Sequence, residues 1–131
     1  MGVVNLLLDT CAFLWLAGDP SRISPAAAAA IDEPCNVLLL SDVSVWEVVL
    51  KHAVGKLPLP EPPRIWIPRQ VSFFQLTRQA IDFEALFRSG ELPAMHRDPF
   101  DRLLAAQALA HQLTIVRPDV PLRQLGANTF W

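Results

Sequence analysis

Short apolar runs, each followed by the start of a helix, constrain the fold of this 131-residue chain more than any other feature. The runs cover residues 3–8, 36–40 and 114–116, and they are rich in leucine, isoleucine and valine. Such runs predict short buried strands. Strands that alternate with helices favour an α/β fold with a mainly parallel sheet. We therefore predict a single α/β domain over residues 1–131, with a central sheet of four to five short strands flanked by helices.

Capping residues, prolines and glycines set the expected boundaries of the other elements. The proline-rich segment 56–68 predicts an extended crossing or a broken helix rather than a linker between domains. Further short strands are expected at 72–76 and 127–131, and a helical turn is expected at 119–125. Helices are predicted over residues 11–17, 25–33, 45–54, 77–90 and 99–112.

The composition limits the class of protein. Hydrophobic residues make up 52% of the chain, but no apolar run reaches the roughly 18–20 residues that span a bilayer, so we expect no membrane contact. Two cysteines, Cys11 and Cys35, do not make a disulfide framework and favour a reducing, cytoplasmic setting. The net charge of −2 provides no global field that would favour nucleic acid.

Acidic residues near the predicted helix starts are the main candidate functional residues. Asp9 follows the first strand, and Glu47 lies in an apolar segment after the second. Asp101 lies in the first turn of the predicted helix 99–112, and Asp119 follows the strand at 114–116. Ligands of open parallel sheets bind beyond the carboxyl ends of the strands, which is where Asp9 and Asp119 are expected.

Each acid also has a purely structural interpretation as a helix cap. Asp98 precedes a proline, the arrangement that is typical of a helix N-cap. Ser44 and Glu47 have the spacing of a capping box. Thr10 and Ser44 are expected to be caps or, alternatively, hydroxyls that hold a neighbouring carboxylate. A non-catalytic binding domain, whose acids only cap helices, therefore stays open as an alternative.

Convergence of the acids at one edge of the sheet would require a cation. Carboxylates that are packed together repel one another and raise each other's pKa unless a positive charge neutralises them. An oxygen-only ligand set without a His or Cys cluster suits Mg²⁺, with Mn²⁺ as the alternative. Such ions activate water and clamp the oxygens of a phosphodiester. Asp9, Glu47 and Asp101 are the expected metal ligands, and another Mg²⁺-dependent phosphoryl-transfer hydrolase, such as a phosphatase, stays open as a further alternative.

Motifs from the first strand to the helix 99–112 point to a known family. They read LLLDT at 6–10, VSVWE at 43–47 with KHAVGKL at 51–57, and HRDPFDRLLAAQA at 96–108. In these motifs the chain resembles the VapC-type toxins of the PIN-domain nucleases over nearly its whole length. The resemblance implies a PIN-like domain and a Mg²⁺-dependent ribonuclease, the toxin of a toxin–antitoxin pair. It also implies an RNA substrate, a cognate antitoxin and a homodimer.

The resemblance implies an acidic catalytic quartet, with Asp9 and Asp101 as the main metal ligands. Glu47 would bind a second ion or orient the attacking water, and Asp119 would contribute weakly or through water. The chain departs from the family pattern next to this fourth acid. Two residues before it the family has Thr or Ser, whereas this chain has Arg117 followed by a proline. Arg117 is a candidate for holding a phosphate.

Overall fold

The computed structural model describes residues 3–94, 97–118 and 121–131. Within them, five strands form one sheet: β1 (Asn5–Leu8), β2 (Val37–Ser41), β3 (Thr77–Gln79), β4 (Thr114–Val116) and β5 (Thr129–Phe130). The α-helices are α1 (Thr10–Gly18), α2 (Pro25–Asp32), α3 (Asp42–Ala53), α4 (Pro63–Phe73), α5 (Phe83–Glu91) and α6 (Pro99–His111). Two short 3-10 helices, η1 (Pro20–Arg22) and η2 (Pro121–Leu125), complete the described elements.

The sheet has the strand order β3-β2-β1-β4-β5, and every pairing in it is parallel. β1 is central, and its leucines point alternately to opposite faces, as the pleat of a strand requires. Leu6 and Leu8 belong to one apolar cluster, and Leu7 belongs to another on the opposite face. The predicted α/β class and the mainly parallel sheet are confirmed.

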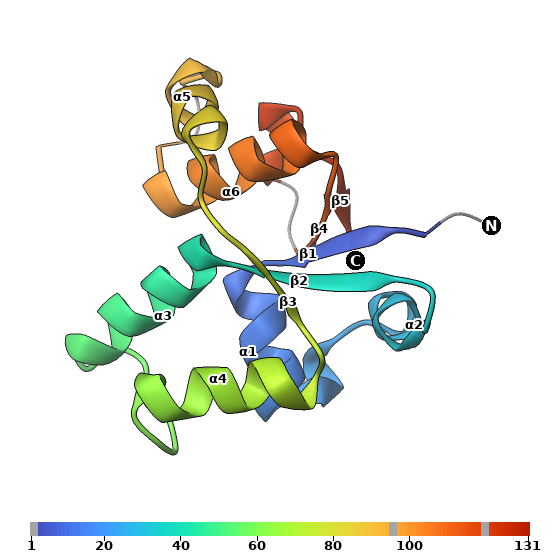
Figure 1. The fold of residues 1–131 in the computed structure, drawn as a ribbon, viewed down its shortest axis with the longest axis vertical. Helices are drawn as coiled ribbons and strands as arrows, with labels where there is room; N and C mark the ends of the chain where they lie inside the picture. Colours follow the sequence, from blue (N-terminus) through green and yellow to red (C-terminus); the bar gives the residue numbers. More distant parts are fainter. Residues whose placement is uncertain (1–2, 95–96, 119–120) are drawn as a thin grey trace.

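Helices cover both faces of the sheet (Figure 1). α1, α2 and α4 lie on one side, where Phe13 packs edge-on against Trp66 with ring centroids 5.7 Å apart. α5 and α6 lie on the other side, where Leu104 and Ala108 of α6 belong to the same apolar cluster as Leu7 of β1. α3 extends from the end of β2 and contacts α1, α4 and α6. Among the described residues, none of the helices has the length and apolar character needed to cross a membrane.

The segment between α3 and α5 differs from the sequence prediction. Residues 63–73 form α4, where the sequence predicts an extended crossing or a broken helix up to residue 68 and a strand at 72–76. Pro63 occupies the first turn of α4, where a missing N–H costs nothing, and the helix continues through Pro68. The strand instead lies at Thr77–Gln79, where a helix start was expected, and α5 begins only at Phe83. The short, exposed strand β3 lacks the apolar pattern that would have revealed it.

Candidate active site

The parallel register of the sheet places the first candidate residues side by side. Leu8 of β1 is paired with Val116 of β4, so the residues that follow them, Asp9 and Arg117, leave adjacent strands at the same edge. The backbone N–H of Asp9 donates to the carbonyl of Val116 at 3.2 Å and so continues the pairing by one residue. The carboxyl edge of the sheet therefore brings a buried carboxylate next to a buried guanidinium.

Asp9 caps α1 and also contacts Arg117. Its Oδ1 accepts the backbone N–H of Ala12 at 2.7 Å, which caps α1. Its Oδ2 lies 3.7 Å from Nε of Arg117. The Asp9 side chain is only 8% exposed, so its charge must be compensated from within the protein or by a bound cation.

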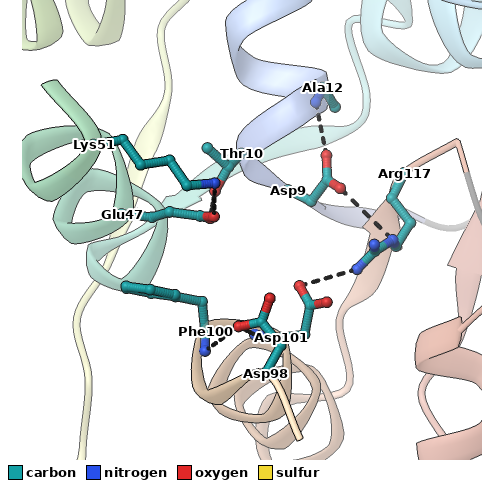
Figure 2. Close-up of polar contacts among 9 residues, drawn as sticks. All are labelled: Asp9, Thr10, Ala12, Glu47, Lys51, Asp98, Phe100, Asp101 and Arg117. Carbon is teal, nitrogen blue, oxygen red and sulfur yellow. Dashed lines mark hydrogen bonds and ion pairs between the residues drawn. The ribbon is translucent and has the colours of Figure 1, made fainter. Parts of the chain in front are cut away.

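Asp101 reaches the same place from α6. Asp98 caps that helix, because its Oδ1 accepts the backbone N–H groups of Phe100 at 2.9 Å and of Asp101 at 3.5 Å. Asp101 lies one turn into the helix, and its Oδ1 lies 3.3 Å from Nη1 of Arg117. The prediction that Asp98 is the cap is confirmed, and the carboxylates of Asp9 and Asp101 converge on one guanidinium (Figure 2).

Glu47 faces the same space from α3. Its Oε1 accepts the hydroxyl of Thr10 at 2.6 Å, and its Oε2 accepts Nζ of Lys51 at 2.6 Å. The hydrogen bond to Glu47 raises the pKa of the Lys51 ammonium above its ordinary value, although partial burial opposes this shift. Thr10 thus holds a carboxylate, which is the second of the two roles expected for it.

The capping box expected at the start of α3 is wrong. The helix begins three residues earlier, because the hydroxyl of Ser41 accepts the backbone N–H of Val43 at 2.9 Å and caps it. Ser44 therefore lies inside the helix rather than at its cap, and Glu47 lies in the middle of the helix with its side chain bonded elsewhere. A role as a helix cap explains Asp98 and one of the two carboxylate oxygens of Asp9, but it does not explain Glu47.

These side chains surround a pocket of about 170 Å³. Figure 2 shows Glu47 and Lys51 on one side, Asp9 and Arg117 on another, and Asp98 and Asp101 below them. The lining residues are Asp9, Thr10, Cys11, Val43, Ser44, Glu47, Asp98, Phe100, Asp101, Leu104 and Arg117. All the site residues predicted from the sequence line this pocket except Asp119, which lies outside the described residues.

An orphaned hydroxyl in this pocket supports the fit of a hydrated cation. Ser44 is buried, and its Oγ has no hydrogen-bond partner among the described residues. Buried polar groups without a partner are rare and call for a bound water, ion or ligand. A hydrated divalent cation would bring such a water, because Mg²⁺ keeps several of its waters and often takes only one or two carboxylates from the protein.

Two cations of the chain offset part of the negative charge of the four carboxylates around the pocket. Within residues 3–94, 97–118 and 121–131, no three His, Cys, Asp or Glu side chains are grouped closely enough to hold a metal ion. Arg117 contacts Asp9 and Asp101, while Lys51 contacts Glu47. The donor set of Asp9 and Asp101 with the Ser44 hydroxyl nevertheless fits a hydrated Mg²⁺, because every donor is an oxygen.

Sequence reasoning missed two features of the site. The pairing of Arg117 with both aspartates depends on the register of β1 against β4, which no local pattern specifies. The second feature is Gln107 of α6, which is fully buried and accepts a short hydrogen bond from Ser41. A glutamine on the apolar face of a buried helix was the signal that could have revealed this contact.

The fold and the pocket define a class, namely parallel-sheet α/β domains with carboxylates gathered beyond the carboxyl ends of the strands. The PIN domain family model matches residues 6–127. The chain is 26% identical over 123 residues to Ribonuclease VapC22 of Mycobacterium tuberculosis (strain ATCC 25618 / H37Rv), a match that covers 92% of each chain. This chain therefore belongs to the PIN domain family, and the resemblance to VapC-type members that its motifs indicated is confirmed.

Solved structures share the fold at low sequence identity. One is VapBC2 from Rickettsia felis bound to a DNA fragment from the promoter, with a TM-score of 0.72, 15% identity and coverage of 97% of this chain and 98% of that one. Another is DNA-bound VapBC from Salmonella typhimurium, with a TM-score of 0.73, 15% identity and 97% coverage of both chains. These likenesses support the fold of the whole described chain.

Proposed function

We propose that this chain is a Mg²⁺-dependent endoribonuclease and the toxin of a toxin–antitoxin pair. The observation that carries the proposal is the pocket in which Asp9, Glu47 and Asp101 gather from three separate elements. Gathering several carboxylates in one partly buried pocket is costly for a fold unless they bind a cation or take part in chemistry. The relative Ribonuclease VapC22 supports RNA as the substrate. The VapBC structures that share the fold support a toxin–antitoxin pair.

Each acid is given a role that follows from its contacts. Asp9 and Asp101 would hold Mg²⁺ or Mn²⁺, with the Ser44 hydroxyl near a water of the ion. When bound, the ion would lower the pKa of a water and stabilise charge on the phosphodiester. Thr10 and Lys51 each donate a hydrogen bond of 2.6 Å to the carboxylate of Glu47 and so hold it in place. Glu47 would orient the attacking water and accept its proton.

Asp119 is proposed to contribute weakly or through water, as the family resemblance implies. Water is the nucleophile in this scheme, and no covalent intermediate with the protein is formed. The phosphodiester would enter through the mouth of the pocket, where Asp101 is 23% exposed and Asp9 only 8%. The more exposed Asp101 would therefore lie closer to the entering RNA, and Asp9 closer to the sheet.

Asparagine at position 101 tests the proposal with the least disturbance of the fold. Asp98 already caps α6, so Asp101→Asn removes a charge without removing the cap. We expect cleavage of a labelled RNA to fall by about 100-fold or more, and EDTA to abolish cleavage by the unchanged protein. Asp42→Asn, which alters an exposed ion pair with Arg78, is the matched control and should cleave normally. Full activity of Asp101→Asn, or cleavage in EDTA, would refute the proposal.

The proposed antitoxin partner is supported by an apolar groove of about 530 Å³ between α3 and α4. The groove is lined by Trp46, Val45, Ile67 and Val71, among other residues. Trp46 is 49% exposed. An amphipathic segment of the antitoxin would place its apolar side in this groove. Trp46→Ala should then weaken antitoxin binding in calorimetry by about tenfold or more, because exposed aromatic anchors carry much of the energy of such interfaces.

The proposed homodimer is supported by an apolar stripe on α5. Phe83 and Phe87 are 77% and 63% exposed, and their ring centroids lie 6.1 Å apart. Leu86 beside them is 44% exposed. Light scattering of the purified chain should give the mass of a dimer, and the double variant with serine at both phenylalanines should give the mass of a monomer.

A further inference from the structure

Arg117 occupies the part of the pocket where a cation would meet both aspartates. It follows β4 directly, and its backbone N–H donates to the carbonyl of Phe130 at 3.0 Å, which fixes its position at the sheet edge. Its side chain is only 9% exposed, with Nε 3.7 Å from Asp9 and Nη1 3.3 Å from Asp101. Figure 2 shows the guanidinium reaching between the two carboxylates.

A buried guanidinium in this position acts as a built-in counterion. Arginine stays protonated in proteins, so it brings a full positive charge to the pocket at every accessible pH. That charge offsets part of the repulsion between Asp9 and Asp101 when no ion is bound. The same charge repels a divalent cation that approaches the same two carboxylates, and little solvent separates them to screen the repulsion.

We propose that Arg117 is an intramolecular competitor of the divalent ion. Its guanidinium holds the cation position between Asp9 and Asp101 in the metal-free protein, and it must withdraw from at least one carboxylate when the ion binds both. The inference rests on the metal site of the proposed function and adds to it a residue that sets the metal affinity. Its consequence is a protein that folds without metal and binds the ion more weakly than its carboxylates alone would allow.

Calorimetric titration of this 131-residue chain with Mn²⁺ alone tests this competition without any RNA. Arg117→Gln keeps hydrogen-bond donors but removes the charge, and we expect it to bind Mn²⁺ about tenfold more tightly or better. Arg117→Lys keeps the charge and should bind more weakly than Arg117→Gln. The matched control is Arg69→Gln, which removes a charge from an exposed ion pair with Glu61 and should bind like the unchanged protein.

A second measurement uses the unchanged protein and does not depend on the folding of any variant. The Nε–H resonance of Arg117 in a ¹⁵N-labelled sample reports its contact with Asp9. On titration with Mg²⁺ we expect this resonance to shift with the same midpoint as metal binding, while the Nε–H resonance of Arg69 stays in place.

The outcomes separate the inference from the function on which it rests. Equal Mn²⁺ affinity in Arg117→Gln and the unchanged protein, or a fixed Arg117 resonance at saturating Mg²⁺, would overturn the competition and leave the metal site standing. No binding of either ion by the unchanged protein or by Arg117→Gln would overturn both. Tighter binding by Arg117→Gln that is lost again in the double variant with Asp101→Asn supports both.

Discussion

Replacing Gln107 with leucine tests how α6, and with it Asp101, is held against the sheet. Gln107 is fully buried and bonds at both ends of its amide. Its Oε1 accepts the hydroxyl of Ser41 at the end of β2, and its Nε2 donates to the carbonyl of Ala80 at 3.1 Å. One side chain therefore connects α6 to the sheet edge and to the segment that leads into α5.

The cost of Gln107→Leu follows from the groups that it leaves without partners. Leucine has a similar size but no polar atoms, so the Ser41 hydroxyl loses its acceptor and the Ala80 carbonyl loses its donor. The buried Ser41 hydroxyl that loses its acceptor costs about 1–3 kcal/mol, whereas Ala80 is exposed, so water can replace the lost donor at its carbonyl. The added apolar burial of leucine offsets part of this cost. We expect a net loss of about 1–2 kcal/mol in the free energy of unfolding, within the roughly 5–15 kcal/mol typical of a domain.

Urea denaturation followed by circular dichroism measures this loss. Gln124→Leu is the matched control, because Gln124 is exposed and the same substitution there should change the free energy of unfolding by less than about 0.5 kcal/mol. The double variant Ser41→Ala with Gln107→Leu should lose less than the sum of the single losses, because both substitutions break the same bond. A loss for Gln107→Leu no larger than that for Gln124→Leu, or strict additivity in the double variant, would refute the reasoning.

Two further predictions concern a cap and a pH dependence. Asp9→Asn should keep its bond to the N–H of Ala12 and be about 1 kcal/mol more stable than Asp9→Ala, yet both variants should lose RNA cleavage; an active Asp9→Asn would contradict its role as a ligand. The N–H of Ala85 and the hydrogen bond with His111 lower the pKa of Asp82 below its ordinary value. Because the folded pKa is the lower one, this stabilisation is present above the unfolded pKa of about 3.8 and is lost as the pH falls through the folded value. Thermal melts at pH 5 and pH 3 should therefore show a larger drop for the unchanged protein than for Asp82→Asn, and equal drops would contradict this cause.

The sequence revealed those parts of the fold whose local pattern is strong. The three apolar runs became β1, β2 and β4, and the Asp98–Pro99 start of α6 was expected where it occurs. The segment from 56 to 79 was predicted only in part. Its prolines suggested an extended crossing or a broken helix, whereas Pro63 and Pro68 fit the first turn and the interior of α4. β3 is short and exposed, so its pairing with β2 rather than its composition defines it.

Most residues that line the pocket could be predicted from the sequence, but their electrostatic contacts could not. Asp9 and Asp101 follow from their places next to helix starts, and Glu47 follows from its apolar surroundings and the family resemblance. The structure brings all three to one pocket. The pairing of Arg117 with two of them requires the register between β1 and β4, which is a long-range property. The cap of α3 was misassigned to Ser44 because Ser41 and Ser44 both lie near the helix start, and only the backbone geometry distinguishes them.

An anomalous difference map from a crystal soaked in Mn²⁺ would locate the cation on which the proposed chemistry depends. We expect a single dominant peak inside the pocket, within ligand distance of the carboxylate oxygens of Asp9 and Asp101, and no such peak in crystals of Asp101→Asn. A map without density there, or with the ion bound elsewhere on the surface, would contradict the assignment of these acids as a metal site.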